Sequence, residues 1–151
     1  MSSLSTAREQ APQDLASADP SRLAAVRARA CDFMRDLQSR DWRRLRRWFT
    51  GTSQVWLPPA GPVEGVGRIL ALFRGIFRRY AELEWEVTRF YPVNATTIIY
   101  ETASWGFLKS DDGDTPYRNS IITVLEFDLQ GKIERLSDYF KDPAAFQPTG
   151  G

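Results

Sequence analysis

The sequence of 151 residues contains no histidine. This absence excludes Ser-His-Asp and Cys-His catalysis, a histidine general base, and the usual histidine-containing zinc and iron sites. Acid–base chemistry in this chain must therefore use Asp, Glu, Tyr, Lys or water. We expect no metal site.

Cysteine, long apolar runs and excess charge are also scarce. Cys31 is the only cysteine and cannot form an internal disulfide, which is consistent with a reducing compartment. No apolar run approaches the roughly 20 residues that span a bilayer. Net charge is +1, from 20 basic and 19 acidic residues, so no overall field favours nucleic acid or an anionic membrane. These features predict a cytoplasmic protein with no nucleic-acid partner and no membrane partner.

The composition and length of the chain predict one globular domain. Hydrophobic residues make up 42% of the chain and charged residues 26%, as in ordinary globular proteins. Residues 1–19 are rich in Ser, Ala, Gln and Pro without periodicity, which predicts a disordered tail. The predicted domain covers residues 20–146, followed by a loose tail at 147–151.

Three helices are predicted before most of the strands. The first begins at Asp19-Pro20-Ser21 and carries an apolar stripe as far as Leu37, and Asp41 is expected to cap a short second helix at 42–49. The third, at 64–80, has a continuous apolar stripe that requires a sheet to pack against. Four arginines crowd the second helix, and they indicate either a solvated helix face or a nucleic-acid site: Arg43, Arg44, Arg46 and Arg47.

The strands follow, and they predict the fold class. A short strand is expected at 53–57, an alternating strand at 81–87, a strand apolar on both faces at 95–108, and a long hairpin at 115–140. We expect an α+β domain in which the helices pack on one concave face of a curved, mainly antiparallel sheet and enclose a pocket.

The hairpin register can be predicted from its turn. If Gln130-Gly131 is a two-residue turn, Leu129 opposes Lys132, and the oppositely charged pair Glu126/Arg135 supports the same register. Thr123 then opposes Asp138. One face would be shared by residues of both strands, namely Tyr117, Asn119, Ile121, Thr123, Leu125, Leu136 and Asp138.

Asp138 is the candidate catalytic residue. On that mixed face its carboxyl would be partly desolvated, and desolvation raises a carboxyl pKa. Such a group can remove a proton next to a carbonyl or return one to an enolate oxygen. The alternative is an ordinary polar residue at the rim of a sheet.

Six further residues are candidates for substrate binding. Tyr117 and Asn119 could donate hydrogen bonds to a developing oxyanion, although structural hydrogen bonds would also explain them. Glu101 is a possible second carboxylate, and the pattern does not settle which face of its strand it occupies. Three tryptophans offer flat surfaces for an aromatic ligand, or pack in the core: Trp56, Trp85 and Trp105.

Together these segments resemble a known family. The helices, the stretch VWLPPAGPVEG and the hairpin YRNSIITVLEFDLQGKIERLSDYFKDP are similar to SnoaL-like polyketide cyclases, over about residues 20–146. These cyclases belong to the nuclear transport factor 2-like superfamily, with ketosteroid isomerase and limonene epoxide hydrolase. The resemblance implies a cone-shaped fold, a homodimer formed through the outer sheet face, and no cofactor.

The resemblance also implies roles for particular residues. Asp138 matches the acidic position that acts as acid or base in the cyclases. The epoxide hydrolases need an Arg and an Asp two residues apart on the strand at 95–108, where this chain has Thr102 and Ser104. Epoxide hydrolysis by that triad is therefore disfavoured.

The resulting hypothesis is a cofactor-independent enzyme of secondary metabolism. It would cyclise, isomerise or dehydrate a polyketide-like or terpenoid-like carbonyl substrate by acid–base chemistry, an isomerase/cyclase or lyase type of reaction. The alternative is a non-catalytic module of the same fold that binds an apolar or aromatic small molecule or dimerises.

Overall fold

The structure is a computed structural model that describes residues 19–146. Of the tail expected at 1–19, residues 1–18 lie outside this range, as does the tail expected at 147–151. Three helices and six strands follow one another in the order α2 (Pro20–Ser39), α3 (Trp42–Arg46), β1 (Gln54–Trp56), β2 (Val63–Glu64), α4 (Val66–Arg79), β3 (Tyr80–Pro92), β4 (Thr97–Leu108), β5 (Thr115–Phe127) and β6 (Ile133–Phe140).

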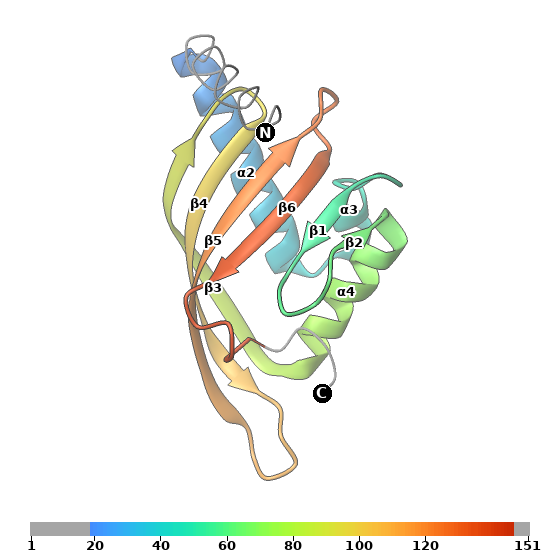
Figure 1. Ribbon diagram of the computed structural model, residues 1–151, viewed down its shortest axis with the longest axis vertical. Coiled ribbons are helices and arrows are strands. Elements are labelled where there is room, and N and C mark those ends of the chain that lie inside the picture. Colours follow the sequence, from blue (N-terminus) through green and yellow to red (C-terminus); the bar gives the residue numbers. More distant parts are fainter. Residues whose placement is uncertain (1–18, 147–151) are drawn as a thin grey trace, which may run out of the picture.

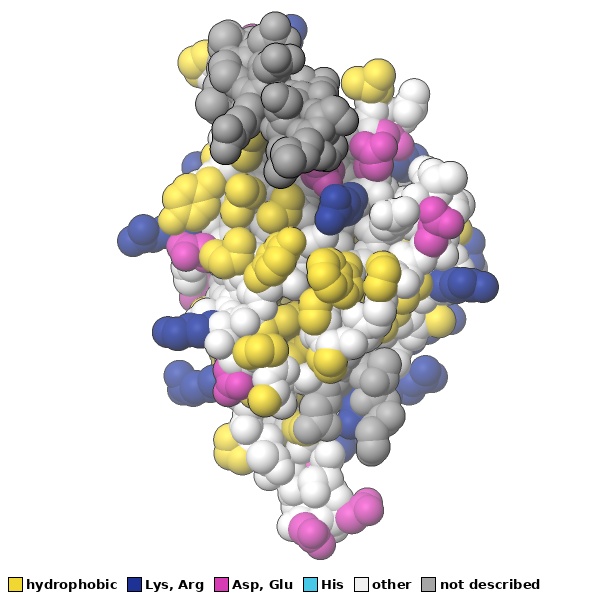
Figure 2. All heavy atoms as spheres, in the orientation of Figure 1, with side chains coloured by type: hydrophobic (Ala, Val, Ile, Leu, Met, Phe, Trp, Pro, Cys, Tyr) yellow, Lys and Arg dark blue, Asp and Glu magenta, His cyan; other side chains and the backbone are white. Residues whose placement is uncertain are grey.

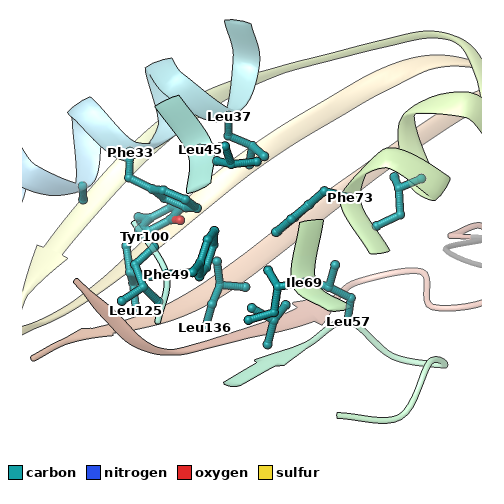
Figure 3. Packing of buried hydrophobic residues seen from close by; sticks show 14 of the residues in the cluster. Phe33, Leu37, Leu45, Phe49, Leu57, Ile69, Phe73, Tyr100, Leu125 and Leu136 are labelled. Atoms are coloured by element: carbon teal, nitrogen blue, oxygen red, sulfur yellow. The ribbon is translucent and has the colours of Figure 1, made fainter. Parts of the chain in front are cut away.

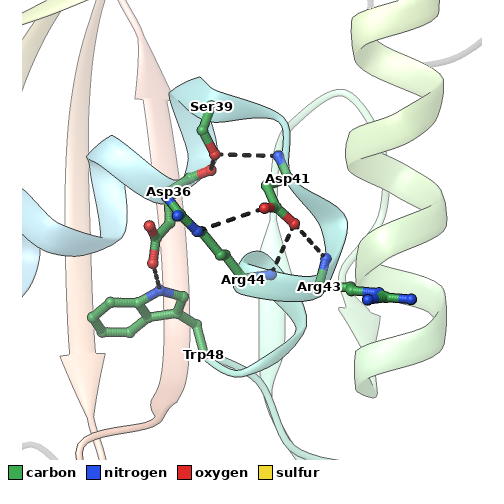
Figure 4. A network of polar contacts seen from close by, with 6 residues as sticks. All are labelled: Asp36, Ser39, Asp41, Arg43, Arg44 and Trp48. Atoms are coloured by element: carbon green, nitrogen blue, oxygen red, sulfur yellow. Dashed lines mark hydrogen bonds and ion pairs between the residues drawn. The ribbon is translucent and has the colours of Figure 1, made fainter.

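The three predicted helices form, and side chains cap the first two. Asp19 precedes α2 and accepts a hydrogen bond from the backbone N–H of Arg22 at 2.9 Å. Asp41 caps α3 in the same way, and the Trp48 indole donates to Asp36 at 2.8 Å, which ties the end of α3 back to α2 (Figure 4). This corner fixes the end of α2, where residues that line the site described below are found. No helix within residues 19–146 is long and apolar enough to cross a membrane.

The strands form one mixed sheet with the order β2-β1-β6-β5-β4-β3. Strands β3 to β6 make an antiparallel meander, whereas β1 joins β6 in parallel. Two bulges interrupt β3, and bulges increase local twist and bend a sheet. Figure 1 shows α2 crossing one face of the sheet, with α4 beside β1 and β2. The predicted α+β class, with helices on one face of a curved sheet, is confirmed.

The long hairpin has the predicted register but a different turn. Thr123 is paired with Asp138, and Glu126 with Arg135. The expected pairing of Leu129 with Lys132 is wrong. The backbone N–H of Asp128 instead donates to the Lys132 carbonyl at 2.8 Å, and a register shift after Glu126 absorbs the extra residue.

The core lies between the helices and the inner face of the sheet. Three aromatic side chains enter this core from three different elements, namely Phe33 of α2, Phe73 of α4 and Tyr100 of β4 (Figure 3). Leu125 and Leu136, which are paired across β5 and β6, complete the floor of this core. The alternation of strand side chains therefore separates a buried inner face from an outer face.

Candidate functional site

A cavity lies between the helices and the inner face of the sheet. Its volume is about 90 Å³, several times the roughly 10–15 Å³ that one water molecule needs. The two long helices contribute only apolar side chains to its wall, namely Phe33, Met34, Leu37, Phe73, Ile76 and Phe77. An apolar wall of this kind favours an uncharged ligand.

The sheet supplies the polar part of the wall. Successive side chains of a strand point to opposite faces, so alternate residues of each strand face inward. The pairing of Tyr100 with Thr123, and of Thr123 with Asp138, places these three residues side by side across β4, β5 and β6. Among the lining residues, all from the described range 19–146, Asp138 is the only carboxylate and none is Lys or Arg.

Asp138 is partly buried at this wall. Burial raises the pKa of its carboxyl to about 7, and the hydrogen bond from Thr123 acts in the opposite direction. Oγ1 of Thr123 donates to Oδ1 of Asp138 at 2.5 Å. A carboxyl with this pKa is divided between its acid and base forms near neutral pH, which suits proton transfer.

Tyr100 stands next to this pair on β4. Its hydroxyl donates to the sulfur of Met34 at 3.2 Å. Burial raises the Tyr100 pKa well above its usual value, the nearby charge of Asp138 raises it further, and a hydrogen bond with Thr123 lowers it. Tyr100 therefore stays neutral and keeps its proton beside the carboxyl.

The three candidate tryptophans lie on different faces. Trp85 lines the cavity, and its ring stacks on Phe77 with centroids 5.9 Å apart. Trp56 and Trp105 lie on the outer face of the sheet, where 39% and 38% of their surfaces are exposed. Only Trp85 is thus placed to contact a ligand in the cavity.

Glu101 also lies on the outer face. It accepts a hydrogen bond from the Tyr91 hydroxyl at 3.2 Å and lies 3.9 Å from the guanidinium of Arg89. Its neighbours along the strand, Tyr100 and Thr102, face the cavity instead. The structure therefore does not bring Glu101 and Asp138 together in one site.

Tyr117 and Asn119 are buried and do not line the cavity. Burial raises the Tyr117 pKa to about 12, the neighbouring Tyr80 adds to the shift, and hydrogen bonds with Asn119 and Ser104 oppose it. The Asn119 side chain is bonded to the backbone of Asp142, donating to its carbonyl at 2.8 Å and accepting from its N–H at 3.0 Å. Asn119 thus fastens the segment after β6 to the sheet.

Sequence reasoning overlooked four hydroxyl-bearing residues of the cavity wall. They are Tyr100, Thr102, Ser104 and Thr123, and none was a candidate site residue. The Thr123/Asp138 pairing was the signal that could have identified Thr123. For the other three, the register between β4 and β5 was needed first. No group of three His, Cys, Asp or Glu side chains within residues 19–146 could hold a metal ion.

Comparison with solved structures identifies the fold. A protein from Shewanella denitrificans OS-217 described as a SnoaL-like polyketide cyclase is 13% identical, with a TM-score of 0.70 over 84% of this chain and 94% of that chain. An NTF2-like protein from Anabaena variabilis ATCC 29413 is 18% identical, with a TM-score of 0.67 over 84% and 96%. An LEH-like epoxide hydrolase from M. tuberculosis is 20% identical, with a TM-score of 0.64 over 81% and 85%.

Sequence comparison identifies the family. No curated protein matches the chain by sequence. The family model described as "SnoaL-like domain" matches residues 30–136, which is more than half of the chain and ends two residues before Asp138. Together with the cone-shaped NTF2-like fold, this match shows that the protein belongs to the SnoaL-like domain family.

Proposed function

We propose that this protein is an acid–base enzyme that removes a proton from the carbon next to a carbonyl group and returns it at another position. Asp138 is the proposed proton acceptor. One observation carries the proposal: the only carboxylate in the lining of an apolar cavity, among residues 19–146, has a pKa raised to about 7. Cyclisation, double-bond isomerisation and dehydration all need this proton transfer.

The proposed step uses the groups at the cavity wall. The Asp138 carboxylate takes the proton, the electron pair of the broken C–H bond forms the enolate double bond, and the carbonyl oxygen becomes negative. The neutral hydroxyl of Tyr100, turned from the Met34 sulfur toward the substrate, would donate a hydrogen bond to that oxygen. Asp138, now protonated, then returns its proton to a different carbon or to oxygen.

The residues that line the cavity also favour one class of substrate. It offers no cation for a carboxylate or phosphate, and its helix side is wholly apolar. An uncharged polyketide-like or terpenoid-like carbonyl compound of secondary metabolism fits this wall best. A reaction like that of the epoxide hydrolases is less well supported, because Thr102 and Ser104 stand in the lining where that reaction would need an Arg and an Asp.

The proposal can be tested without the natural substrate. In heavy water, proton removal next to a carbonyl and its reversal replace hydrogen by deuterium. 2-Indanone is a compact uncharged ketone with acidic C–H bonds beside its carbonyl, so the protein should accelerate its deuteration. The rate should rise with pH and level off above about pH 7, as Asp138 ionises. A rate equal to that in buffer alone would contradict the proposal.

We also propose that two copies associate through the outer face of the sheet. Hydrophobic side chains gather on this face in Figure 2. The large exposed ones are Trp56, Tyr91, Trp105, Phe107, Ile122 and Tyr139. Clustered exposed apolar surface of this kind is typical of protein–protein interfaces. Association would cover these side chains and leave the cavity, which lies on the inner face of the sheet, free for ligand.

A further inference from the structure

Two buried polar atoms at the cavity have no partner within residues 19–146. They are Nε1 of Trp85 and Oγ1 of Thr102, and both residues line the same cavity. Buried polar atoms are nearly always hydrogen-bonded, because leaving one unpaired forfeits its interaction with water. Both atoms lie just beneath the surface of the cavity wall on neighbouring strands, so a ligand that pairs with them would require the two side chains to turn slightly toward it.

The chemistry of the two atoms specifies what the ligand offers. An indole N–H can only donate a hydrogen bond, and a threonine hydroxyl can donate or accept. The group that satisfies both is an acceptor, such as a carbonyl oxygen. The absence of a cation among the lining residues of the described range indicates an uncharged acceptor rather than a carboxylate.

The register places this pair away from Asp138. Thr102 is paired with Ile121, two residues along β5 from Thr123, which is the partner of Asp138. Strand geometry puts Thr102 about 7 Å along the strands and about 10 Å across them from Asp138, measured between Cα atoms. Trp85 is one strand farther, since it is paired with Ser104. One carbonyl cannot both react at Asp138 and occupy this position.

We propose that Trp85 and Thr102 form a second subsite that binds an acceptor oxygen of the ligand remote from Asp138. The subsite deepens the proposed function and rests on it for the position of the reacting carbonyl. The ligand class is an uncharged, largely apolar molecule with at least two oxygen functions, one near Asp138 and one at the Trp85/Thr102 subsite. Trp85 and Thr102 determine specificity and take no part in the proton transfer.

A matched pair of ligands tests the subsite by binding alone. 2-Acetylnaphthalene and 2-isopropenylnaphthalene have the same shape, but only the first has an acceptor oxygen. The wild-type protein should bind the acetyl compound about tenfold more tightly, the size expected for hydrogen bonds that satisfy buried donors. The indole N–H resonance of Trp85 should shift with the acetyl compound and stay in place with the isopropenyl compound.

Single substitutions test whether the tighter binding of the acetyl compound depends on Trp85 and Thr102. Trp85→Phe and Thr102→Val should each reduce the preference for the acetyl compound to about threefold or less. The controls Trp56→Phe and Thr88→Val, which change exposed residues outside the cavity lining, should retain the preference. Asp138→Asn should also retain it, so that loss of proton transfer and loss of the subsite are separate results. Equal affinity for the two ligands, no binding of the acetyl compound, or a preference that survives in both subsite variants would overturn the proposal.

Discussion

The hydroxyl of Thr123 donates a hydrogen bond of 2.5 Å to the carboxylate of Asp138, across the pairing of β5 with β6. This bond favours the ionised carboxylate, whereas burial favours the protonated acid. The balance between them leaves the Asp138 pKa at about 7. Thr123 is therefore a positioning residue that acts through Asp138.

Thr123→Val should shift the pH dependence of the reaction. Valine keeps the shape of the side chain but cannot donate, so the Asp138 pKa should rise by about one pH unit. The midpoint of the pH–rate curve for 2-indanone deuteration should move upward accordingly, with a smaller change in the plateau rate. Thr123→Ser retains the hydroxyl and should retain the midpoint. An unchanged midpoint in the valine variant would show that the bond does not tune Asp138.

Asp138→Asn should make the protein more stable at high pH. Below the ordinary pKa of 3.8 the wild-type carboxyl is protonated in both the folded and the unfolded states. Between 3.8 and about 7 it ionises only in the unfolded state, so the free energy of unfolding falls as pH rises. The asparagine variant has no carboxyl at this position and so does not lose stability in this way. Its free energy of unfolding, relative to that of wild type, should therefore rise by about 2–4 kcal/mol between pH 4 and pH 8.

Urea denaturation at several pH values measures this difference. Asp112→Asn, in the exposed turn between β4 and β5, is the matched control and should follow wild type throughout. If the difference between Asp138→Asn and wild type is the same at pH 4 and pH 8, the Asp138 pKa is not raised in the folded protein.

Asn119→Ala should loosen the segment that follows β6. The substitution removes both hydrogen bonds to the Asp142 backbone and should lower the free energy of unfolding by about 1–3 kcal/mol. Amide hydrogen exchange at Asp142 should accelerate, while the pH–rate midpoint stays near 7 because Asn119 does not line the cavity. Asn94→Ala, which removes an asparagine bonded to the backbone N–H groups of Thr96 and Thr97, should leave Asp142 protected. A large loss of deuteration with unchanged stability would instead assign Asn119 an oxyanion role.

Charge on the outer face of the sheet should prevent association. Ile122 and Tyr139 are paired across β5 and β6 and are both exposed there. The double variant Ile122→Lys/Tyr139→Lys should sediment as a monomer at concentrations where wild type is a dimer. Leu129→Lys is the control, because Leu129 is 92% exposed at the hairpin turn. A wild-type protein that is monomeric, or a double variant that is still dimeric, would contradict the proposed interface.

Much of the fold could be predicted because local patterns were unambiguous. The charge pair Glu126/Arg135 was enough to predict that Thr123 faces Asp138, even though the turn itself was wrong. A one-residue bulge changed the turn without changing the register nearer Asp138. Strand β2 was missed, because Val63–Glu64 is only two residues long and follows a loop rich in proline and glycine.

The site was harder to predict than the fold. Strand β4 carries apolar or aromatic residues at both odd and even positions, so its sequence does not reveal that Tyr100 and Thr102 face the cavity while Glu101 and Trp105 face outward. Asn119 was placed on the correct face of β5, but the segment after β6 crosses there and takes up its hydrogen bonds. Both facts depend on contacts between segments distant in sequence.

The deuteration of 2-indanone by wild type and Asp138→Asn tests the central claim most directly. Asparagine keeps the size of the side chain but cannot accept the proton, and general-base catalysis typically contributes about 10²- to 10⁴-fold. The wild-type protein should accelerate deuteration well above buffer, and the variant, confirmed as folded by its denaturation curve, should lose at least about 100-fold of that acceleration. Equal acceleration by the two proteins would contradict the assignment of Asp138 as the catalytic base.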